Sequence, residues 1–148
     1  MTTEQQTESE VERVVLDTLA AHKSFYLATS GSNGPWVNGA YFAESGPFTL
    51  DLVLEQRGRT LAAIRENPTV AVVISTGSPA DPFLQAQATV EVLDAGAEED
   101  EVRRVLLAKI PEIEPFLAAP LNAVRLSIPV WRVTDVPRGW LPGRELVR

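Results

Sequence analysis

The stretch FYLATSGSNGPWVNGAYFAE, residues 25–44, decides the fold. Side chains alternate along its first part with a period of two, which predicts a β-strand. Phe25, Leu27 and Thr29 would lie on one face of this strand, and Tyr26 and Ala28 on the other. The following SGSNGP is dense in turn formers, and its Asn-Gly pair suits a tight reversal. A second strand is then expected over residues 36–45, so the stretch predicts an antiparallel pair.

Further strands are predicted on both sides of the next turns. FTLDLVLEQ (48–56) predicts a third strand, and the apolar TVAVVIS (69–75) predicts a buried one. PFLQAQATVEVLD (82–94) and AVRLSIPVWRVTDV (123–136) complete the set, with Pro129 indicating an edge or a bulge in the last strand. Six strands in a chain of this length favour a mainly β protein, a small antiparallel barrel whose helices cover its open ends or edges.

Three helices are predicted between or before these strands. The first, over residues 9–22, has Ser9 as its expected cap and one apolar face: Val11, Val14, Val15, Thr18 and Leu19. A short helix over 60–66 must end before Pro68, and an acidic amphipathic helix is expected over 97–110. The whole of residues 1–148 is expected to form one domain, with 1–8 a flexible N-terminus and 137–148 a C-terminal tail.

Composition narrows the function classes. The 148 residues are 45% hydrophobic, which suits a single core, and the absence of cysteine excludes disulfides and thiolate sites. A formal net charge of -7 argues against nucleic-acid binding, because phosphate neutralisation requires a basic surface. No apolar run approaches the roughly 18 residues of a membrane span. The polar, acidic start is typical of neither a secretory signal nor a transit peptide, so we expect a cytoplasmic protein.

The turn before the short helix carries the sharpest chemistry. Arg57 and Arg59 flank Gly58, and residues two apart in an extended chain point to the same side. A helix N-terminus attracts anions, Thr60 can cap the helix or donate its hydroxyl, and guanidinium groups bind phosphate bidentately. These features predict a phosphate site. The alternative is a surface turn in which the arginines pair with neighbouring glutamates, Glu55 or Glu66.

Other candidate residues allow two interpretations each. Asn38-Gly39 could form a hairpin turn, but the short chain before it favours a continuous strand whose glycine lets a flat ligand approach. Trp131 and Trp140 could lie on an aromatic ligand whose charged groups bind to nearby arginines, namely Arg132, Arg138 and Arg144. Alternatively, the two tryptophans could pack in the core or at a subunit contact. The only histidine, His22, is expected to interact with the C-terminal dipole of the first helix, with metal or haem ligation as the alternative. No catalytic acid–base pair and no metal site is predicted.

The chain resembles the pyridoxamine 5'-phosphate oxidase-like family of FMN-binding split β-barrels. The resemblance runs from the first helix to VWRVTDV (130–136) and depends on the order and spacing of several stretches: FYLATSGSNGPWVNGAYFAE, RGRTLAAIRENPTVAVVI, LQAQATVEVLD and KIPEIEPFL. It implies a six-stranded split barrel that forms a homodimer and binds FMN at the subunit interface. A small-molecule substrate and hydride transfer at the flavin ring are the implied chemistry.

The resemblance also implies positions for the cofactor. Residues of the second strand would line the isoalloxazine ring, the end of the third strand would flank it, and Trp131 would cover it from the partner chain: the lining residues are Asn38, Gly39, Ala40 and Tyr41, and the flanking residues are Val53 and Leu54. At the phosphate, the family pattern Ser-Arg-Lys corresponds to Gly58-Arg59-Thr60. Arg59 therefore matches, and Arg57 is expected to replace the missing lysine charge.

Two departures affect the expected reaction. Pyridoxamine 5'-phosphate oxidases hold their substrate with a C-terminal Arg–His motif, and no histidine follows His22 in this chain. Oxidation of vitamin B6 is therefore not expected. A deazaflavin coenzyme or haem in place of FMN, and a non-catalytic barrel that binds a cofactor or a protein partner, are the alternatives that the resemblance leaves open.

Overall fold

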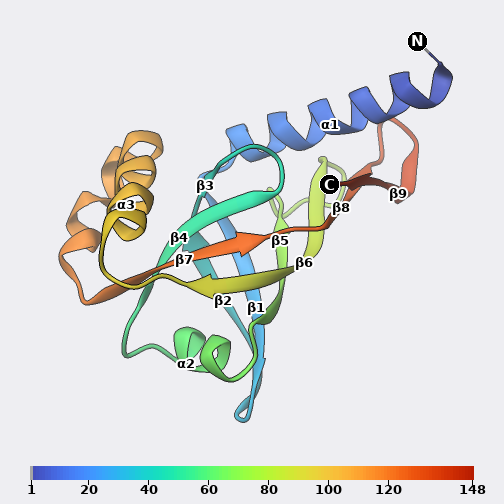
Figure 1. The fold of residues 1–148 in the computed structure, drawn as a ribbon. Helices are drawn as coiled ribbons and strands as arrows, with labels where there is room; N and C mark the ends of the chain where they lie inside the picture. Colours follow the sequence, from blue (N-terminus) through green and yellow to red (C-terminus); the bar gives the residue numbers. More distant parts are fainter. Residues whose placement is uncertain (1) are drawn as a thin grey trace.

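The structure is a computed structural model that describes residues 2–148. Within this range the chain forms one curled antiparallel sheet with helices at its margins, as Figure 1 shows. The strands are β1 (Ser24–Gly31), β2 (Gly34–Tyr41), β3 (Ala43–Glu44), β4 (Thr49–Glu55), β5 (Thr69–Ile74), β6 (Phe83–Val92), β7 (Leu121–Ser127), β8 (Val130–Asp135) and β9 (Trp140–Val147). The helices are α1 (Thr3–Ala21), α2 (Arg59–Glu66), α3 (Ala97–Lys109) and the 3-10 helix η1 (Pro111–Ala118). The mainly β architecture predicted from the sequence is confirmed.

The hairpin of β1 and β2 forms as the sequence predicts. The strands pair from Ser24 with Tyr41 down to Gly31 with Gly34, and Gly34 accommodates a φ of +92° at the reversal. The ladder continues without a break through Asn38 and Gly39. The continuous strand is therefore confirmed, and a hairpin turn at Asn38-Gly39 is excluded.

The sheet runs in the order β2-β1-β5-β6-β7-β4-β3, and β8 also pairs with β6. The segment predicted as one last strand is interrupted at Pro129 into β7 and β8, which lie along the same edge of β6. Thr89 pairs with Ser127 and Gln85 with Arg132, so four steps along β6 oppose five along the other segment. This extra residue is the bulge that the proline indicated, and it lets the sheet curl.

Three sequence predictions about the strand count and the ends of the chain were wrong. The sheet contains nine strands within residues 2–148 and not six, because the last predicted strand divides, the two-residue β3 forms, and the segment expected as a tail forms β9 along β8. Burial of Trp140 and Leu146 against the core stabilises this last strand. The first helix begins at Thr3 and not at Ser9, because the side chain of Thr2 accepts from Gln5 N in a complete capping box. The segment expected to be a flexible N-terminus is therefore helical from Thr3, and Met1 lies outside the described residues.

Each helix covers a different margin of the sheet (Figure 1). The long helix α1 lies against β6, β8 and β9, α2 lies against β1, β2 and β4, and α3 lies against β3, β4 and β7. The main apolar core fills the curl of the sheet and includes Val15 and Leu19 of α1, while a smaller cluster around Val102 and Leu106 anchors α3. No helix within residues 2–148 combines the length and apolar character that crossing a bilayer would require.

The close approach of the hairpin tip to α2 gives a testable prediction. A Cβ at Gly31 would lie 2.8 Å from Glu66 Oε2 and 3.1 Å from the Cα of Ala63. We expect Gly31→Ala to lower the free energy of unfolding by roughly 1–3 kcal/mol, measured by urea denaturation. Gly39→Ala is the matched control, because its Cβ would meet nothing closer than 4.0 Å. Equal urea midpoints for the two variants would contradict the close packing of the tip.

Candidate functional site

The turn between β4 and α2 is bounded by a glycine cap. Gly58 is the N-cap of α2, and its N–H donates to the Glu55 carbonyl oxygen at 3.1 Å. A Cβ at Gly58 would lie 3.2 Å from that same oxygen, so the backbone packs closely here. No side chain caps the helix, which leaves its first N–H groups without a side-chain acceptor. The expected capping by Thr60 is wrong, because Thr60 is the second helical residue and is buried.

Arg57 forms a local ion pair. Its Nε lies 2.6 Å from Glu55 Oε1, and its main-chain N–H donates to the same oxygen at 3.2 Å. This contact lowers the pKa of Glu55 and raises the pKa of Arg57. The Arg57 side chain is 77% exposed, so the pair lies in solvent. For Arg57 the structure therefore supports the surface-turn alternative, with the charge already matched by a neighbour.

Arg59 lies in a different environment. Its guanidinium lies 4.1 Å from the centroid of the Trp36 ring, and Nη2 donates to the carbonyl oxygen of Asn33 at 2.8 Å. Within residues 2–148 it makes no ion pair with a carboxylate. Glu66, its other predicted partner, instead accepts from Ser32, which lowers the pKa of Glu66. Arg59 is thus oriented by an aromatic face and a carbonyl, and its charge stays available to an anion.

A hollow of about 360 Å³ lies at the other end of β2. It is lined by Gly39, Ala40 and Tyr41 from the predicted ring site, together with His22, Ser24, Phe25, Tyr26 and Ser75. Asn38 precedes these residues on β2 and is not part of the lining. Apart from His22, the lining side chains are uncharged, so the hollow suits an uncharged, flat group. Gly39 leaves the backbone open to such a group, since a Cβ there would meet no atom closer than 4.0 Å.

Strand β2 joins the hollow to Arg59. Trp36 and Tyr41 are five residues apart on this strand, which corresponds to roughly 16 Å of extended chain. Side chains five residues apart point to opposite faces of a strand, but β2 is an edge strand, so one ligand along its free edge can reach both the hollow and Arg59.

Two of the predicted ring contacts have side chains in the main core. Trp131 is fully buried there, and its Nε1 donates to the carbonyl oxygen of Pro47, and Leu54 is buried in the same core. Val53 is not part of the hollow lining, but it packs against the same small cluster under α3 as Tyr41 does. The expectation that Trp131 covers a ring from a partner chain is therefore wrong, and its core alternative is right. The alternation of strand residues can show that a tryptophan is in a strand, but not which face is inside.

His22 ends α1 as predicted and lies beside the hollow. It is the C-cap residue, and its Nδ1 donates to the carbonyl oxygen of Thr18 at 2.8 Å. Because a carbonyl oxygen can only accept, this bond requires a proton on Nδ1, and Nε2 has no hydrogen-bond partner within residues 2–148. His22 also lines a second hollow beneath α1, together with Asp17, Asp81 and Asp135.

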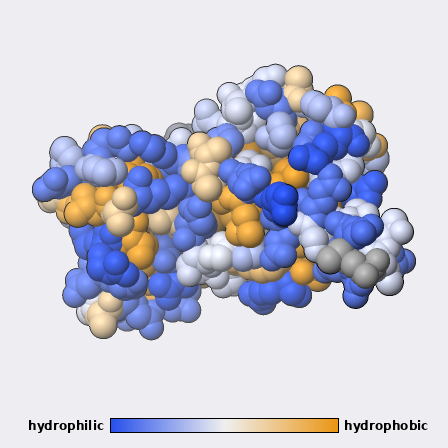
Figure 2. Space-filling view, turned by 90° about the horizontal axis from the view of Figure 1, so that it is seen from above, coloured by the Kyte–Doolittle hydropathy of each residue, from blue (hydrophilic) through white to orange (hydrophobic). Residues whose placement is uncertain are grey.

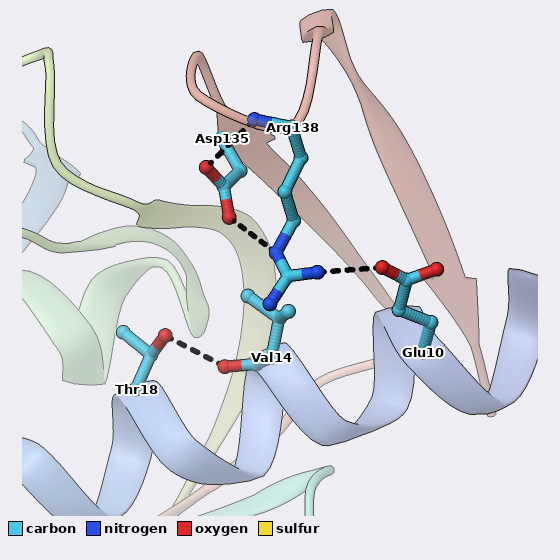
Figure 3. Close-up of polar contacts among 5 residues, drawn as sticks. All are labelled: Glu10, Val14, Thr18, Asp135 and Arg138. Atoms are coloured by element: carbon cyan, nitrogen blue, oxygen red, sulfur yellow. Dashed lines mark hydrogen bonds and ion pairs between the residues drawn. The ribbon is translucent and has the colours of Figure 1, made fainter.

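The C-terminal arginines are engaged with the protein itself. Figure 3 shows Arg138 between the buried Asp135 and Glu10 of α1. The Nε of Arg138 lies 2.9 Å from Asp135 Oδ2, and its Nη1 lies 2.5 Å from Glu10 Oε1. Arg132 pairs with Glu145, and Arg144 lies 5.7 Å from the centroid of the Trp140 ring. These arginines tie the last two strands together and to α1. The predicted role in binding a charged ligand group is not supported by these contacts.

Sequence reasoning missed Trp36, Asn33 and Tyr26. The sequence identifies Trp36 only as a strand residue, because its contact with Arg59 depends on how the hairpin lies against α2. The available signal was the tight turn, which places the start of β2 beside the end of β1. Tyr26 pairs with Gly39 in the same ladder, and that register alone would have placed it next to the expected ring position.

Comparison with known families agrees with this geometry. A family model described as pyridoxamine 5'-phosphate oxidase matches residues 11–134. The chain belongs to the pyridoxamine 5'-phosphate oxidase family. Comparison with curated proteins found no match.

Solved structures of similar fold have different ligands in their names. A haem-binding protein from Mycobacterium smegmatis has a TM-score of 0.74 at 16% identity, over 92% of this chain and 57% of its own. HutZ, the haem storage protein from Vibrio cholerae, has a TM-score of 0.67 at 19% identity, over 79% and 89%. An FAD-binding protein from Mesorhizobium loti has a TM-score of 0.61 at 20% identity, over 76% and 84%. This chain therefore spans little more than half of the mycobacterial protein, and these identities show the split-barrel fold alone.

The unlike surroundings of the two arginines predict unlike effects on phosphate binding. We expect Arg59→Ala to weaken FMN binding by about 10- to 100-fold, the loss typical of a charged hydrogen bond. Arg57→Ala should change the affinity by less than about threefold, since Glu55 already matches that charge. Both affinities are measured by quenching of flavin fluorescence. A larger loss in Arg57→Ala would show that Arg57 leaves Glu55 to bind the phosphate.

Proposed function

We propose that this protein binds FMN along β2, with the isoalloxazine ring in the uncharged hollow and the phosphate at Arg59. The observation that carries the proposal is the placement of these two features. The hollow beside Gly39 lies at one end of β2, and at the other end Trp36 contacts Arg59, which has no acidic partner within residues 2–148. The unoccupied N–H groups at the start of α2 add a second attraction for the phosphate.

The residues present fit such a cofactor. Gly39 lets the ring approach the backbone, while Tyr26 and Tyr41 add aromatic surface to the lining of the hollow. Bound FMN would supply the hydride chemistry, so the protein needs no acid–base pair of its own to make the reactive atom. The protein is therefore proposed to be an oxidoreductase that acts on a small organic molecule. Oxidation of pyridoxamine phosphate remains unexpected, since no histidine follows His22.

Haem is the second candidate for the same hollow. His22 lines it, and the bond from its Nδ1 to Thr18 leaves Nε2 free to ligate iron. The haem-binding proteins of similar fold are consistent with this possibility. Against it, Asp17 and Asp81 border the neighbouring hollow that also contains His22, and their carboxylates would repel haem propionates, while Asp135 in the same hollow is paired with Arg138.

Titration with FMN and riboflavin tests the first candidate. We expect FMN to bind at least about tenfold more tightly than riboflavin, because only FMN carries the phosphate that Arg59 can bind. A deazaflavin coenzyme is titrated in parallel, since it would share the ring hollow. Equal affinities for FMN and riboflavin would contradict the phosphate site.

A Soret band that appears with haem and is lost in His22→Ala would favour haem, and the absence of binding to all of these ligands would favour a partner-binding barrel.

We also propose that the protein is a homodimer that buries the outer face of β2, β1, β5 and the first part of β6. Ladder pairs place a set of uncharged residues together on this face: Val37, Gly39, Tyr26, Ala28, Ala71, Val73, Gln85 and Gln87. Tyr26 is 56% exposed and Val37 is 62% exposed in the single chain. In a protein of net charge -7, a second copy can meet this face without charge repulsion, and an isologous contact is the simplest arrangement. The ring hollow shares Tyr26 and Gly39 with this face, so the second copy would shield the ring from water.

A new charge in this face should break the dimer. We expect Val37→Glu to convert a dimer to a monomer in sedimentation velocity, because the symmetric contact would bury two carboxylates. Val147→Glu on β9 is the matched control, since Val147 is 61% exposed and lies outside the face. A dimer that survives Val37→Glu, or a wild-type monomer, would overturn the proposed interface.

A further inference from the structure

Trp36 has an unusual position among the tryptophans of the chain. Its side chain is 41% exposed, whereas Trp131 and Trp140 are buried in the core. One face of its indole carries the Arg59 guanidinium at 4.1 Å. The exposed surface of Trp36 is therefore not explained by core packing, and its main contact is with a cation.

Arg59 is held at three points. Its backbone is fixed as the first residue of α2, its guanidinium lies over Trp36, and Nη2 donates to the Asn33 carbonyl oxygen. A guanidinium has five N–H donors in one plane, and the Asn33 carbonyl oxygen accepts from one of its nitrogens. The remaining N–H groups have no acceptor within residues 2–148, which leaves them available to a ligand.

The hairpin tip that carries Asn33 and Trp36 is itself fixed to α2. At the far end of the helix, Glu66 accepts from Ser32 N at 2.6 Å and from Ser32 Oγ at 2.9 Å. Asn67 Nδ2 donates to the Ser30 carbonyl oxygen at 3.2 Å. The two ends of α2 thus hold the same hairpin, so Trp36 and Asn33 are rigid supports for Arg59 and not mobile loop groups.

A buried hydroxyl lies opposite Trp36. Thr29 pairs with Trp36 in the ladder, is 3% exposed, and its Oγ1 has no hydrogen-bond partner among residues 2–148. Buried side-chain hydroxyls without a partner are rare in folded proteins and indicate a place that a water or ligand atom can complete. The Thr29 hydroxyl, which can both donate and accept a hydrogen bond, lies beside the same aromatic residue that orients Arg59.

We propose that Trp36 is the positioning residue of the anion site, and that it presents the Arg59 guanidinium edge to a phosphomonoester. The proposal rests on the proposed phosphate position and adds the group that orients its arginine. A phosphomonoester is the expected class because two parallel N–H donors on one guanidinium edge match two oxygens of a terminal phosphate. Trp36 acts through Arg59 and does not touch the reacting ring.

The test compares FMN and riboflavin in variants of Trp36. We expect Trp36→Leu to weaken FMN binding by about three- to tenfold, the range for loss of a cation–π contact, with little change for riboflavin. Trp36→Phe should be intermediate, since a phenyl ring restores part of the aromatic face. Trp36→Leu should cause no further loss in an Arg59→Ala background. Equal losses for FMN and riboflavin, or additive losses in the double variant, would overturn the positioning role.

Fluorescence separates this inference from the FMN proposal. Inorganic phosphate should change the tryptophan emission of the wild type, and the change should vanish in Trp36→Phe and in Arg59→Ala. Val136→Ala, an exposed apolar position in the turn after β8, should behave as the wild type in both assays. A phosphate response without FMN binding would contradict the flavin proposal and would still support the role of Trp36 in positioning Arg59. FMN binding without a phosphate response would overturn the role of Trp36.

Discussion

Eight consecutive residue pairs join β1 to β2, and this ladder fixes which side chains of the hairpin face the core and which face outward. A shift by one residue would move Phe25 and Leu27 out of the core and bring Tyr26 into it, so burial enforces the register. The same ladder places Gly39 beside Tyr26 at one end and Asn33 beside α2 at the other. Both the uncharged hollow and the orientation of Arg59 depend on this single hairpin.

The two arginines of the α2 turn show how neighbours decide the use of a charge. Arg57 lies in solvent with Glu55, and such an exposed pair contributes little to stability and leaves little charge for a ligand. Arg59 is two residues away, yet it is matched by an aromatic face and a carbonyl dipole. Neither of these partners neutralises it. Of the two arginines of this turn, Arg59 is therefore the one whose charge is not matched by a carboxylate within residues 2–148.

The sequence predicted most of the fold because its signals are local. Alternation, turn formers and the Asn-Pro stop placed β1, β2, β4, β5, β6, α2 and α3 close to their observed bounds, and Pro129 marked the bulge. The start of α1 was missed although a Thr-x-x-Gln capping signal precedes it, because Ser9 offered a second one nearer the apolar face.

The site was less predictable, because its geometry depends on contacts between distant segments. The spacing of the sequence identified Arg57 and Arg59 as candidates for anion binding. It could not show that their surroundings differ, because Trp36 and Asn33, which contact Arg59, come from the distant β1–β2 hairpin. Burial of Trp131 was equally hidden, because either side of a strand can face inward. The position of β9 depended on pairing with β8, and the turn formers Pro137 and Gly139 between them indicated a turn but not the strand that follows it.

The bridge from Arg138 to Glu10 and Asp135 joins the first helix to the turn between the last two strands. Figure 2, which views the molecule from the side of α1, shows apolar groups between polar ones on this face. The partners of α1 are β6, β8 and β9, so its stripe of valines and leucines has no cover until much later segments are synthesised. Because α1 precedes these strands in the chain, it would be synthesised before them and would dock after them. During synthesis its exposed stripe is the surface that a chaperone would meet, and fast, complete translation would shorten that exposure.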